Sequence, residues 1–463
     1  MPPFDESNGG APSPKLPGKP CDPWMALKTQ RGFGNEHETE ALRGALPARN
    51  NPQRAPLGLY AEQYSGTAFT APRATNRRTW VYRIAPSAAR GAAALEKPPL
   101  AAPPRLEAPD VAAHEPLRWA PRGASTSGVD WVDGLEVVCG AGSPEGKDGV
   151  SVQSYRCDAD MVDKAYASTD GHLLIVPERG ALRVTTELGR LRCAPGSCLV
   201  VPRNVLFSVA IDGEFARGWV LETYAGAFAL PELGPIGSNG LAEARDFEAP
   251  VAWYEDRECA FRVVTKFRGA FHASAATHSV FDVVAWRGTY APVVYDLERF
   301  VPVNAVKCDH PDPSIFTVLT VPSATPGVPV ADFVVFPERY ACAVDTFRPP
   351  YFHKNVMSEF MGLIRGAYDG KGEAFGPGCA SLHGAGVPHG PDADTFASAS
   401  TCDTSRPAML AGGLAFMFET NALLGVAPRY ALGGPRGPDA AYASAWAALP
   451  RRFAGPKVAP DSA

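Results

Sequence analysis

Short β-forming runs separated by turns dominate the middle of the sequence and constrain the fold more than any other feature. Five such runs lie between residues 172 and 224: HLLIVP (172–177), ALRVTTE (181–187), SCLVVP (197–202), LFSVAI (206–211) and RGWVLETY (217–224). The turns ERG, APG, PRN and DGE between them recur about every ten residues. Gly (45) and Pro (46) together make up about a fifth of the 463 residues, which disfavours a helical bundle. The pattern predicts an antiparallel β-sandwich or barrel.

Strand character returns in the second half of the chain. The runs are FDVVAWRG (281–288), IFTVLTV (315–321), ADFVVFP (331–337), FMGLIRGAY (360–368) and LAFMFET (414–420). We therefore expect a mainly β protein with two tightly packed β-sandwich or barrel domains, residues 25–297 and 298–450. The Pro/Gly/Ser-rich residues 1–24 are predicted to form a disordered arm and residues 451–463 a tail. The Ala/Pro-rich stretch 86–118 is predicted to be an extended surface segment.

Charge and hydropathy exclude several classes of function. Lys and Arg number 44 and Asp and Glu number 49, so the net charge of −5 offers no broad cationic surface to nucleic acid or anionic lipid. No run of about 18 apolar residues exists to span a membrane, and the N-terminus lacks the apolar segment of a secretory signal. The ten cysteines form no CxxC pair and are too sparse for a disulfide scaffold. We expect free thiols and a cytoplasmic protein.

Several common catalytic motifs are missing from the sequence. No GxGxxG follows a predicted strand, and neither a P-loop nor an HExxH motif occurs. The string GPIGSNG (234–240) has Ile236 where a nucleophile elbow needs its first glycine. These absences leave dinucleotide, nucleotide and serine-hydrolase chemistry without support.

Histidines gather around one unusual carboxylate in the second half of the chain. Four of the nine histidines fall within 80 residues, namely His310, His353, His383 and His389. Glu359 lies in the same window, directly before the apolar run FMGLI, and a charged side chain is almost never buried unless it is paired or bound to a metal. Two histidines and one carboxylate are typical of non-haem Fe(II) sites, and the same set binds catalytic zinc. The spacing does not choose between these metals, or between a metal site and ordinary hydrogen-bonded histidines.

Neither a helix nor one straight strand brings His353 and Glu359 onto a single ion. Their separation of six residues corresponds to about 600° of helical rotation, which places them on different faces. Along a strand it corresponds to about 20 Å. The chain must therefore fold back between them, near residues 354–355. His383 and His389 have the same spacing across a Gly-rich loop, so we expect the site at a strand-and-loop mouth of a β scaffold.

His310 is a different kind of candidate. It lies in the turn VKCDHPDPSIF (306–316), between an aspartate and a proline. A histidine near a metal is a good proton acceptor at neutral pH. The same turn also fits a histidine that only pairs with Asp309 or Asp312.

Longer strings across nearly the whole chain resemble the homogentisate 1,2-dioxygenase family, the ring-opening enzymes of tyrosine and phenylalanine catabolism. The matching strings are GFGNE (32–36), LYAEQYSGTAFTAPR (59–73), GPIGSNGLAEARDF (234–247), AWYEDR (252–257), HPDPSIFTVLT (310–320), TFRPPYFHKN (346–355), MSEFMGLIRG (357–366) and PHGPDAD (388–394). The sequence departs from the family at Phe352, where a tyrosine is frequent, and in the loop 369–379 beside Tyr368.

The resemblance implies roles for particular residues and a cofactor. The implied Fe(II) ligands are His353, Glu359 and His389, the implied proton acceptor is His310, and the implied substrate contacts are Tyr368, His383 and His389. The resemblance also implies that the C-terminal domain is a cupin-like, jelly-roll barrel carrying the iron. It further implies a homohexamer built as a dimer of trimers.

The activity implied by the resemblance is opening of the homogentisate ring by O2 to give 4-maleylacetoacetate. Direct reaction of triplet dioxygen with a closed-shell ring is spin-forbidden, and Fe(II) with open positions binds both partners. Two other hypotheses remain at this point. One is a zinc-dependent hydrolase using the same His/Glu site, and the other is a non-catalytic β-sandwich protein that binds a small molecule.

Overall fold

The computed structural model describes residues 24, 27–97, 114–123, 128–303, 306–372, 374–431 and 435–455. Residues 1–23 of the predicted arm and residues 456–463 of the predicted tail lie outside this part of the chain. The expectation of a mainly β protein is confirmed. Within the described ranges, no helix is long and apolar enough to cross a membrane. None of the nine cysteines found there forms a disulfide.

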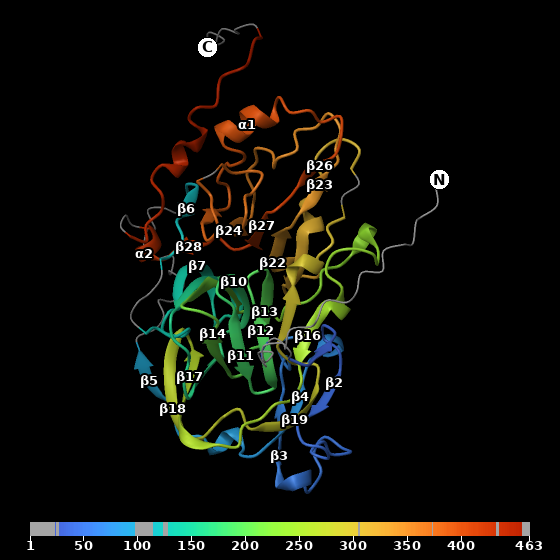
Figure 1. Ribbon diagram of the computed structural model, residues 1–463, viewed down its shortest axis with the longest axis vertical. Coiled ribbons are helices and arrows are strands. Elements are labelled where there is room, and N and C mark those ends of the chain that lie inside the picture. Colours follow the sequence, from blue (N-terminus) through green and yellow to red (C-terminus); the bar gives the residue numbers. More distant parts are fainter. Residues whose placement is uncertain are drawn as a thin grey trace, which may run out of the picture.

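Three sheets form the body of the molecule, with the nine-stranded sheet between the other two (Figure 1). In order across the nine-stranded sheet, its strands are β1 (Thr29–Arg31), β16 (Phe247–Pro250), β20 (Val293–Asp296), β13 (Ser197–Val201), β10 (His172–Arg179), β15 (Ala216–Thr223), β8 (Asp148–Cys157), β7 (Glu136–Ser143) and β28 (Gly425–Val426). A seven-stranded sheet covers one of its faces: β12 (Gly189–Cys193), β11 (Leu182–Thr186), β14 (Phe207–Ile211), β9 (Lys164–Ser168), β17 (Glu258–Phe267), β18 (Ala270–His278) and β5 (Ala94–Lys97).

The third sheet of the body belongs mostly to the C-terminal half, which runs from yellow through orange to red in Figure 1. Its six antiparallel strands are, in order, β21 (Thr317–Pro322), β22 (Pro329–Phe336), β27 (Leu414–Thr420), β24 (Ser358–Arg365), β25 (Ala380–His383) and β6 (Leu117–Trp119). Two smaller sheets contain β2 (His37–Glu40), β19 (Val283–Gly288), β4 (Thr79–Arg83) and β3 (Tyr60–Tyr64), and β23 (Arg339–Ala341) with β26 (Ala408–Leu410). The only α-helices among the described residues are short, α1 (Ala393–Ala399) and α2 (Pro428–Ala431).

Strand β10 explains why the run LLIVP (173–177) is apolar at every position. Leu173 and Ile175 pack into the core shared with the seven-stranded sheet. Leu174 and Val176 point the other way, into the core shared with the six-stranded sheet. Successive side chains of a strand alternate between faces, so a strand covered on both sides is apolar throughout. One hydrophobic core therefore joins the two halves of the chain.

The two halves also exchange strands. β6, from the first half, extends the six-stranded sheet beside β25, and β28, from the second half, pairs with β7 in the nine-stranded sheet. The stretch 86–118 is therefore less irregular than expected at its ends, because β5 and β6 both lie in sheets. Its middle, residues 98–113, lies outside the described part of the chain.

The strand predictions differ from the structure mainly at their ends. Each of the ten predicted runs contains a strand, but Ile315 and Phe316 belong to a 3-10 turn (Pro313–Phe316) that precedes β21. Pro313 at the first helical position and the Asp312 side chain, which accepts a hydrogen bond from the Ser314 N–H, favour the turn over a longer strand.

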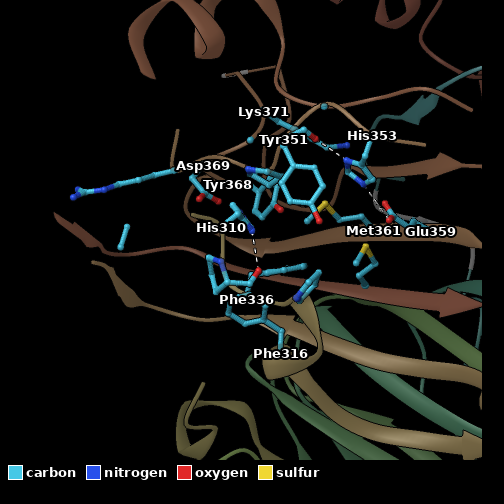
Figure 2. Close-up of a pocket in the computed structure, with 18 of the residues that line it drawn as sticks. His310, Phe316, Phe336, Tyr351, His353, Glu359, Met361, Tyr368, Asp369 and Lys371 are labelled. Atoms are coloured by element: carbon cyan, nitrogen blue, oxygen red, sulfur yellow. Dashed lines mark hydrogen bonds and ion pairs between the residues drawn. The ribbon is translucent and has the colours of Figure 1, made fainter. Parts of the chain in front are cut away.

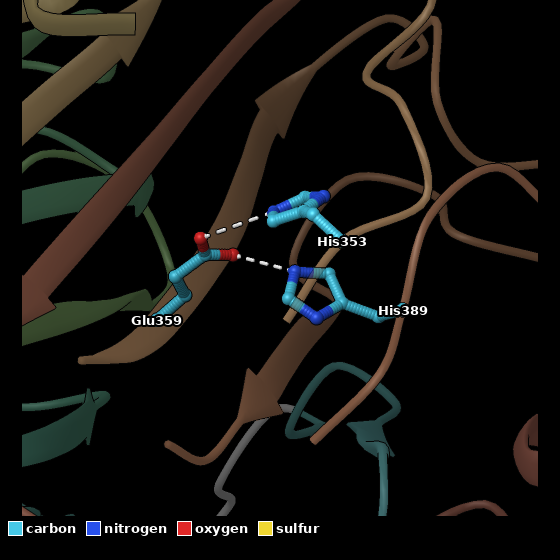
Figure 3. A group of neighbouring side chains, drawn as sticks. All are labelled: His353, Glu359 and His389. Atoms are coloured by element: carbon cyan, nitrogen blue, oxygen red, sulfur yellow. Dashed lines mark hydrogen bonds and ion pairs between the residues drawn. The ribbon is translucent and has the colours of Figure 1, made fainter. Parts of the chain in front are cut away.

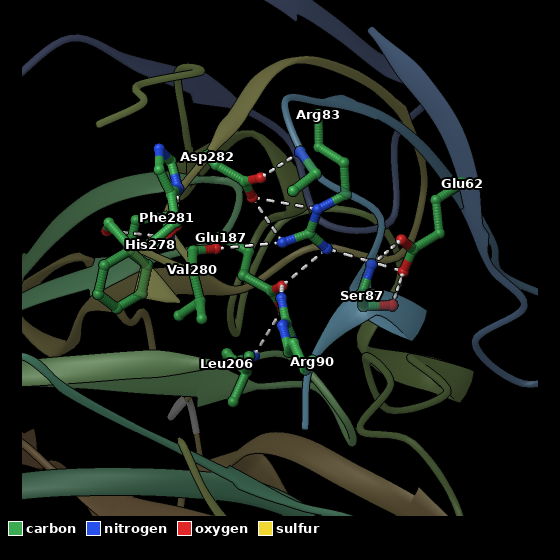
Figure 4. Close-up of polar contacts among 12 residues, drawn as sticks. Glu62, Arg83, Ser87, Arg90, Glu187, Leu206, His278, Val280, Phe281 and Asp282 are labelled. Atoms are coloured by element: carbon green, nitrogen blue, oxygen red, sulfur yellow. Dashed lines mark hydrogen bonds and ion pairs between the residues drawn. The ribbon is translucent and has the colours of Figure 1, made fainter. Parts of the chain in front are cut away.

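A buried ionic cluster fixes the smaller four-stranded sheet to the body of the molecule (Figure 4). Arg83, 1% exposed at the end of β4, donates to Asp282 at 2.6 Å and to Glu187 at 3.1 Å. Arg90 contacts Glu187 as well, at 3.0 Å. This cluster joins segments that are about 200 residues apart in the sequence.

Candidate metal centre

Glu359 reaches an inner cavity because of its register in β24. Phe360 and Ile364 point into the core shared with the nine-stranded sheet. Met361 and Leu363 point to the opposite face, where they pack with residues of β22 and β27. Glu359 shares this second face by the two-residue period of the strand and is 7% exposed. The unusual carboxylate of the sequence is therefore buried.

Polar residues in register with Glu359 continue across the neighbouring strands. Glu359 is paired with His383 of β25 on one side and with Glu419 of β27 on the other. Glu419 is in turn paired with Asp332 of β22. Four adjacent strands thus present a row of three carboxylates and one imidazole on a single face of the sheet.

His353 and His389 come from two loops that hold each other next to this row. The backbone N–H of each donates to the carbonyl of the other, at 2.9 Å in both directions. Gly390 makes this approach possible, because a Cβ atom there would lie only 2.9 Å from the Cα atom of Phe352. The chain folds back between His353 and Glu359, as the spacing requires.

The Nε2 atoms of both histidines point at the Glu359 carboxylate (Figure 3). The distances from Nε2 to the nearest carboxylate oxygen are 3.6 Å for His353 and 3.0 Å for His389. Each Nδ1 donates to a backbone carbonyl, of Tyr351 at 2.6 Å and of Val387 at 3.0 Å. This places the proton on Nδ1 and leaves the Nε2 lone pairs free, the arrangement of a metal-binding histidine. The three candidate ligand atoms lie within 4.8 Å of one another, which fits one divalent cation.

The charge around the three residues also suits a cation. Burial opposes ionisation of Glu359, but its contacts with the imidazoles of His353, His383 and His389 hold the pKa of its carboxyl well below the ordinary value. Burial and the negative charge of Glu359 raise the pKa of Glu419 to about 8. Two neighbouring carboxylates compete for one proton in the metal-free protein, and a divalent cation would relieve that competition.

The remaining predicted site residues line the same cavity (Figure 2). His310 donates from Nδ1 to the Pro311 carbonyl at 2.9 Å rather than to an aspartate, which leaves Nε2 free to accept a proton. Its ring meets the edge of Tyr351, with 5.0 Å between centroids. Tyr368 packs on Phe336 at 5.4 Å, and burial raises the pKa of its phenol well above the ordinary value.

His383 lies next to His353, Glu359 and His389, which we call the triad. Its ring stacks on His389 at 3.9 Å with an interplanar angle of 15°, and its Nδ1 lies 3.8 Å from Glu359 Oε2. Burial, together with the positive charge of Lys371, lowers the pKa of His383 to about 3, so the ring is neutral. Its Nε2 accepts from the Tyr442 hydroxyl at 3.0 Å, which directs the Nδ1 proton toward Glu359.

Sequence reasoning missed several residues of this centre, namely Asn355, Lys371, Glu419 and Tyr442. The Asn355 amide donates to the second oxygen of Glu359. Glu419 carried a usable signal, because it interrupts the apolar run LAFMFET as Glu359 precedes FMGLI. Lys371 and Tyr442 carried none, because their role depends on contacts between segments distant in the sequence.

Comparison with known protein families settles the relationship that the geometry suggests. Residues 28–297 match the model described as homogentisate 1,2-dioxygenase N-terminal, and residues 298–453 match homogentisate 1,2-dioxygenase C-terminal. The chain belongs to the homogentisate 1,2-dioxygenase family. It is accordingly an oxidoreductase of this family, with a two-part chain and a His/His/Glu group that could hold a metal.

Solved structures outside the homogentisate 1,2-dioxygenase family show only distant likeness. The protein Ylba from E. coli is 8% identical, with coverage of 67% of this chain and 93% of that chain and a TM-score of 0.28. A cupin 2 conserved barrel domain protein from Leptotrichia buccalis is 10% identical, with coverage of 62% and 89% and a TM-score of 0.24. Likeness at this level says nothing about the chemistry of this family member.

Proposed function

We propose that this chain is a homogentisate 1,2-dioxygenase that uses Fe(II) and O2 to open the homogentisate ring, giving 4-maleylacetoacetate. The observation that supports the proposal most is the convergence of His353, Glu359 and His389 at one wall of a cavity. The membership of the chain in the family gives the reaction and substrate to which this site is assigned.

The donor set matches the proposed metal. Two neutral imidazoles and one carboxylate on the same side of an ion leave further coordination positions open, as in non-haem Fe(II) oxygenases. Fe(II) held there would supply a place where a phenol oxygen and dioxygen bind side by side and would accept electron density from the ring. The backbone carbonyls of Tyr351 and Val387 orient the two imidazoles before any metal binds.

The cavity residues supply binding, proton transfer and shielding. We assign His310 to accept the proton of the substrate hydroxyl, because its Nε2 is free while Nδ1 is fixed. Tyr368, His383 and His389 are assigned to contact the substrate. Phe316 and Phe336 pack together at 5.0 Å on the cavity wall and exclude water from the reacting ring.

Product formation tests the function and the role of His310 together. The Fe(II)-loaded protein, mixed with homogentisate in air, is expected to generate the absorbance band of maleylacetoacetate. The variant His310→Ala should keep its iron and lose about 100-fold or more in turnover. His278→Ala is the matched control, because His278 pairs with Asp256 away from the cavity. Absence of product from the wild type would overturn the function, and normal turnover by His310→Ala would overturn the assigned base.

Assembly and location also belong to this proposal. The family resemblance implies a homohexamer built as a dimer of trimers. We also propose a cytoplasmic location, the default for a chain with no run of about 18 apolar residues. Light scattering on the purified chain measures the assembly directly. A mass of six copies is expected.

A further inference from the structure

Lys371 places a positive charge in the cavity wall without a carboxylate beside it (Figure 2). Its Nζ donates to Ser381 Oγ at 2.6 Å and to the Tyr442 hydroxyl at 3.0 Å. The ammonium also lies 4.5 Å from the centre of the Phe375 ring. An ammonium group has three N–H donors, so one remains after these two hydrogen bonds. No carboxylate oxygen of the described residues lies within 4.0 Å of Nζ.

Other charged groups near the cavity already have partners. Arg339 pairs with Asp369 at 3.2 Å. Arg348 donates to the backbone carbonyls of residues 343, 404 and 406. Asp392, the acid that follows the His389 loop, accepts from the N–H groups of residues 372 and 395, one with each oxygen. Among these groups, Arg348 and Lys371 have no carboxylate partner, and Lys371 is the one held by side-chain hydroxyls alone.

An unbalanced cation at such a position is costly, which points to a missing anion. Burial lowers the pKa of Lys371 to about 7, although the negative charge of Glu359 acts in the opposite direction. Proteins rarely keep a partly buried ammonium unless a counter-ion completes the site. The two hydroxyl groups hold the ammonium in place without neutralising it.

The position of Lys371 relative to the triad indicates how long a ligand must be to reach both the ammonium and the candidate metal. Its acceptor Ser381 and the triad neighbour His383 are two residues apart on β25, so they share a face at a spacing of about 6.6 Å. His383 stacks on His389. The hydroxyl that holds the ammonium is thus about one strand step from the histidine that stacks on a candidate metal ligand, a separation on the scale of a single substituted aromatic ring.

We propose that Lys371 binds the carboxylate of an aryl-acetate substrate and selects it over uncharged hydroquinones. This inference rests on the proposed function and assigns the acetate arm of homogentisate to Lys371, while the neighbouring ring hydroxyl faces the triad. Ser381 and Tyr442 are positioning residues, because they orient the ammonium. Lys371 is a specificity-determining residue that takes no part in proton transfer.

The test compares homogentisate with its uncharged amide, 2,5-dihydroxyphenylacetamide, in the wild type and in Lys371→Met. The wild type should prefer homogentisate in KM by about 30-fold, as expected for a partly buried charge pair. In Lys371→Met the KM for homogentisate should rise by a similar factor, the KM for the amide should hardly change, and kcat should fall less than KM rises. Lys371→Arg should restore part of the preference. Lys147→Met, which removes an exposed cation from the turn between β7 and β8, away from the cavity, is the matched control.

A measurement without turnover accompanies the kinetics. Anaerobic calorimetry of homogentisate binding to the Fe(II)-loaded variants should show the same loss of affinity in Lys371→Met while iron content stays constant. An unchanged preference in Lys371→Met overturns the inference and leaves the proposed function intact. If that variant does not fold, the wild type decides alone, because equal affinity for homogentisate and its amide also overturns the inference. A wild type that turns over neither compound overturns the proposed function instead.

Discussion

Two buried clusters of charged residues show how differently the two halves of this protein use ionic groups. In the N-terminal half, Arg83 neutralises Glu187 and Asp282, so the cluster contains its own cation (Figure 4). In the C-terminal half, Glu359 lies among three histidines and next to Glu419, and no lysine or arginine of the described residues pairs with it (Figure 3).

This difference indicates that the buried charges around Arg83 stabilise the fold, whereas the buried charge of Glu359 serves to bind a ligand. A buried ion pair with satisfied hydrogen bonds is stable only while both partners are present. A carboxylate with converging imidazole lone pairs is complete only with an external cation. Removing a residue should therefore damage folding in the first cluster and metal binding in the second.

The largest expected effect is on folding, from Arg83→Met. This change leaves two buried carboxylates without their main partner and should lower the free energy of unfolding by about 3–5 kcal/mol. Denaturant titration of the wild type and the variant measures the difference. Arg78→Met is the control, because the ion pair of Arg78 with Glu36 is exposed and should be worth at most about 1 kcal/mol. Equal losses in the two variants would contradict a structural role for the Arg83 cluster.

Glu359→Gln should have the opposite effect, because it should impair metal binding and leave the stability of the fold nearly unchanged. Loss of the carboxylate ligand should weaken Fe(II) binding by at least about 100-fold and abolish turnover. The free energy of unfolding of the metal-free variant should stay within about 1 kcal/mol of the metal-free wild type, because the change also removes a buried charge. Metal analysis after gel filtration and denaturant titration provide both readings. Glu298→Gln, an exposed glutamate that pairs with Arg365, should retain iron.

Metal binding itself should stabilise the protein, by a somewhat smaller amount. Free Fe(II) at 100 times its Kd should add about 2.7 kcal/mol to the free energy of unfolding, and a chelator should remove this gain. The thermal midpoint, recorded anaerobically with and without chelator, measures the effect. Glu359→Gln should show no such gain, whereas Arg78→Met should show all of it. A midpoint that ignores both metal and chelator would argue for a purely structural histidine cluster.

The smallest effect is the pH dependence of the Arg83 cluster. Burial alone would raise the pKa of Glu187, but Arg83 and Arg90 hold it below the ordinary value of 4.5. Because the folded pKa lies below the unfolded one, this stabilisation is complete above pH 4.5 and is lost as the pH falls through the lowered value. The stability difference between wild type and Arg83→Met should therefore shrink as the pH falls below 4.5. A difference that grows in acid would contradict the assigned charge states.

The features of this protein that depend on neighbouring residues could be predicted from the sequence, whereas those that depend on contacts between distant segments could not. The run HLLIVP predicted a strand, and the position of Glu359 before FMGLI predicted a buried carboxylate, because alternation and burial act over a few residues. The exchange of β6 and β28 between the halves depends on pairing across about 260 or more residues, which no local pattern encodes. The contact between Lys371 and Tyr442 is of the same kind, since it joins two segments 71 residues apart.

Oxygen consumption tests the central claim most directly. The Fe(II)-loaded wild type, supplied with homogentisate in a closed cell with an oxygen electrode, should consume one O2 for each homogentisate converted. The zinc-loaded protein should consume none and form no product. Conversion of homogentisate at an undiminished rate without O2, or by the zinc-loaded protein, would contradict the account.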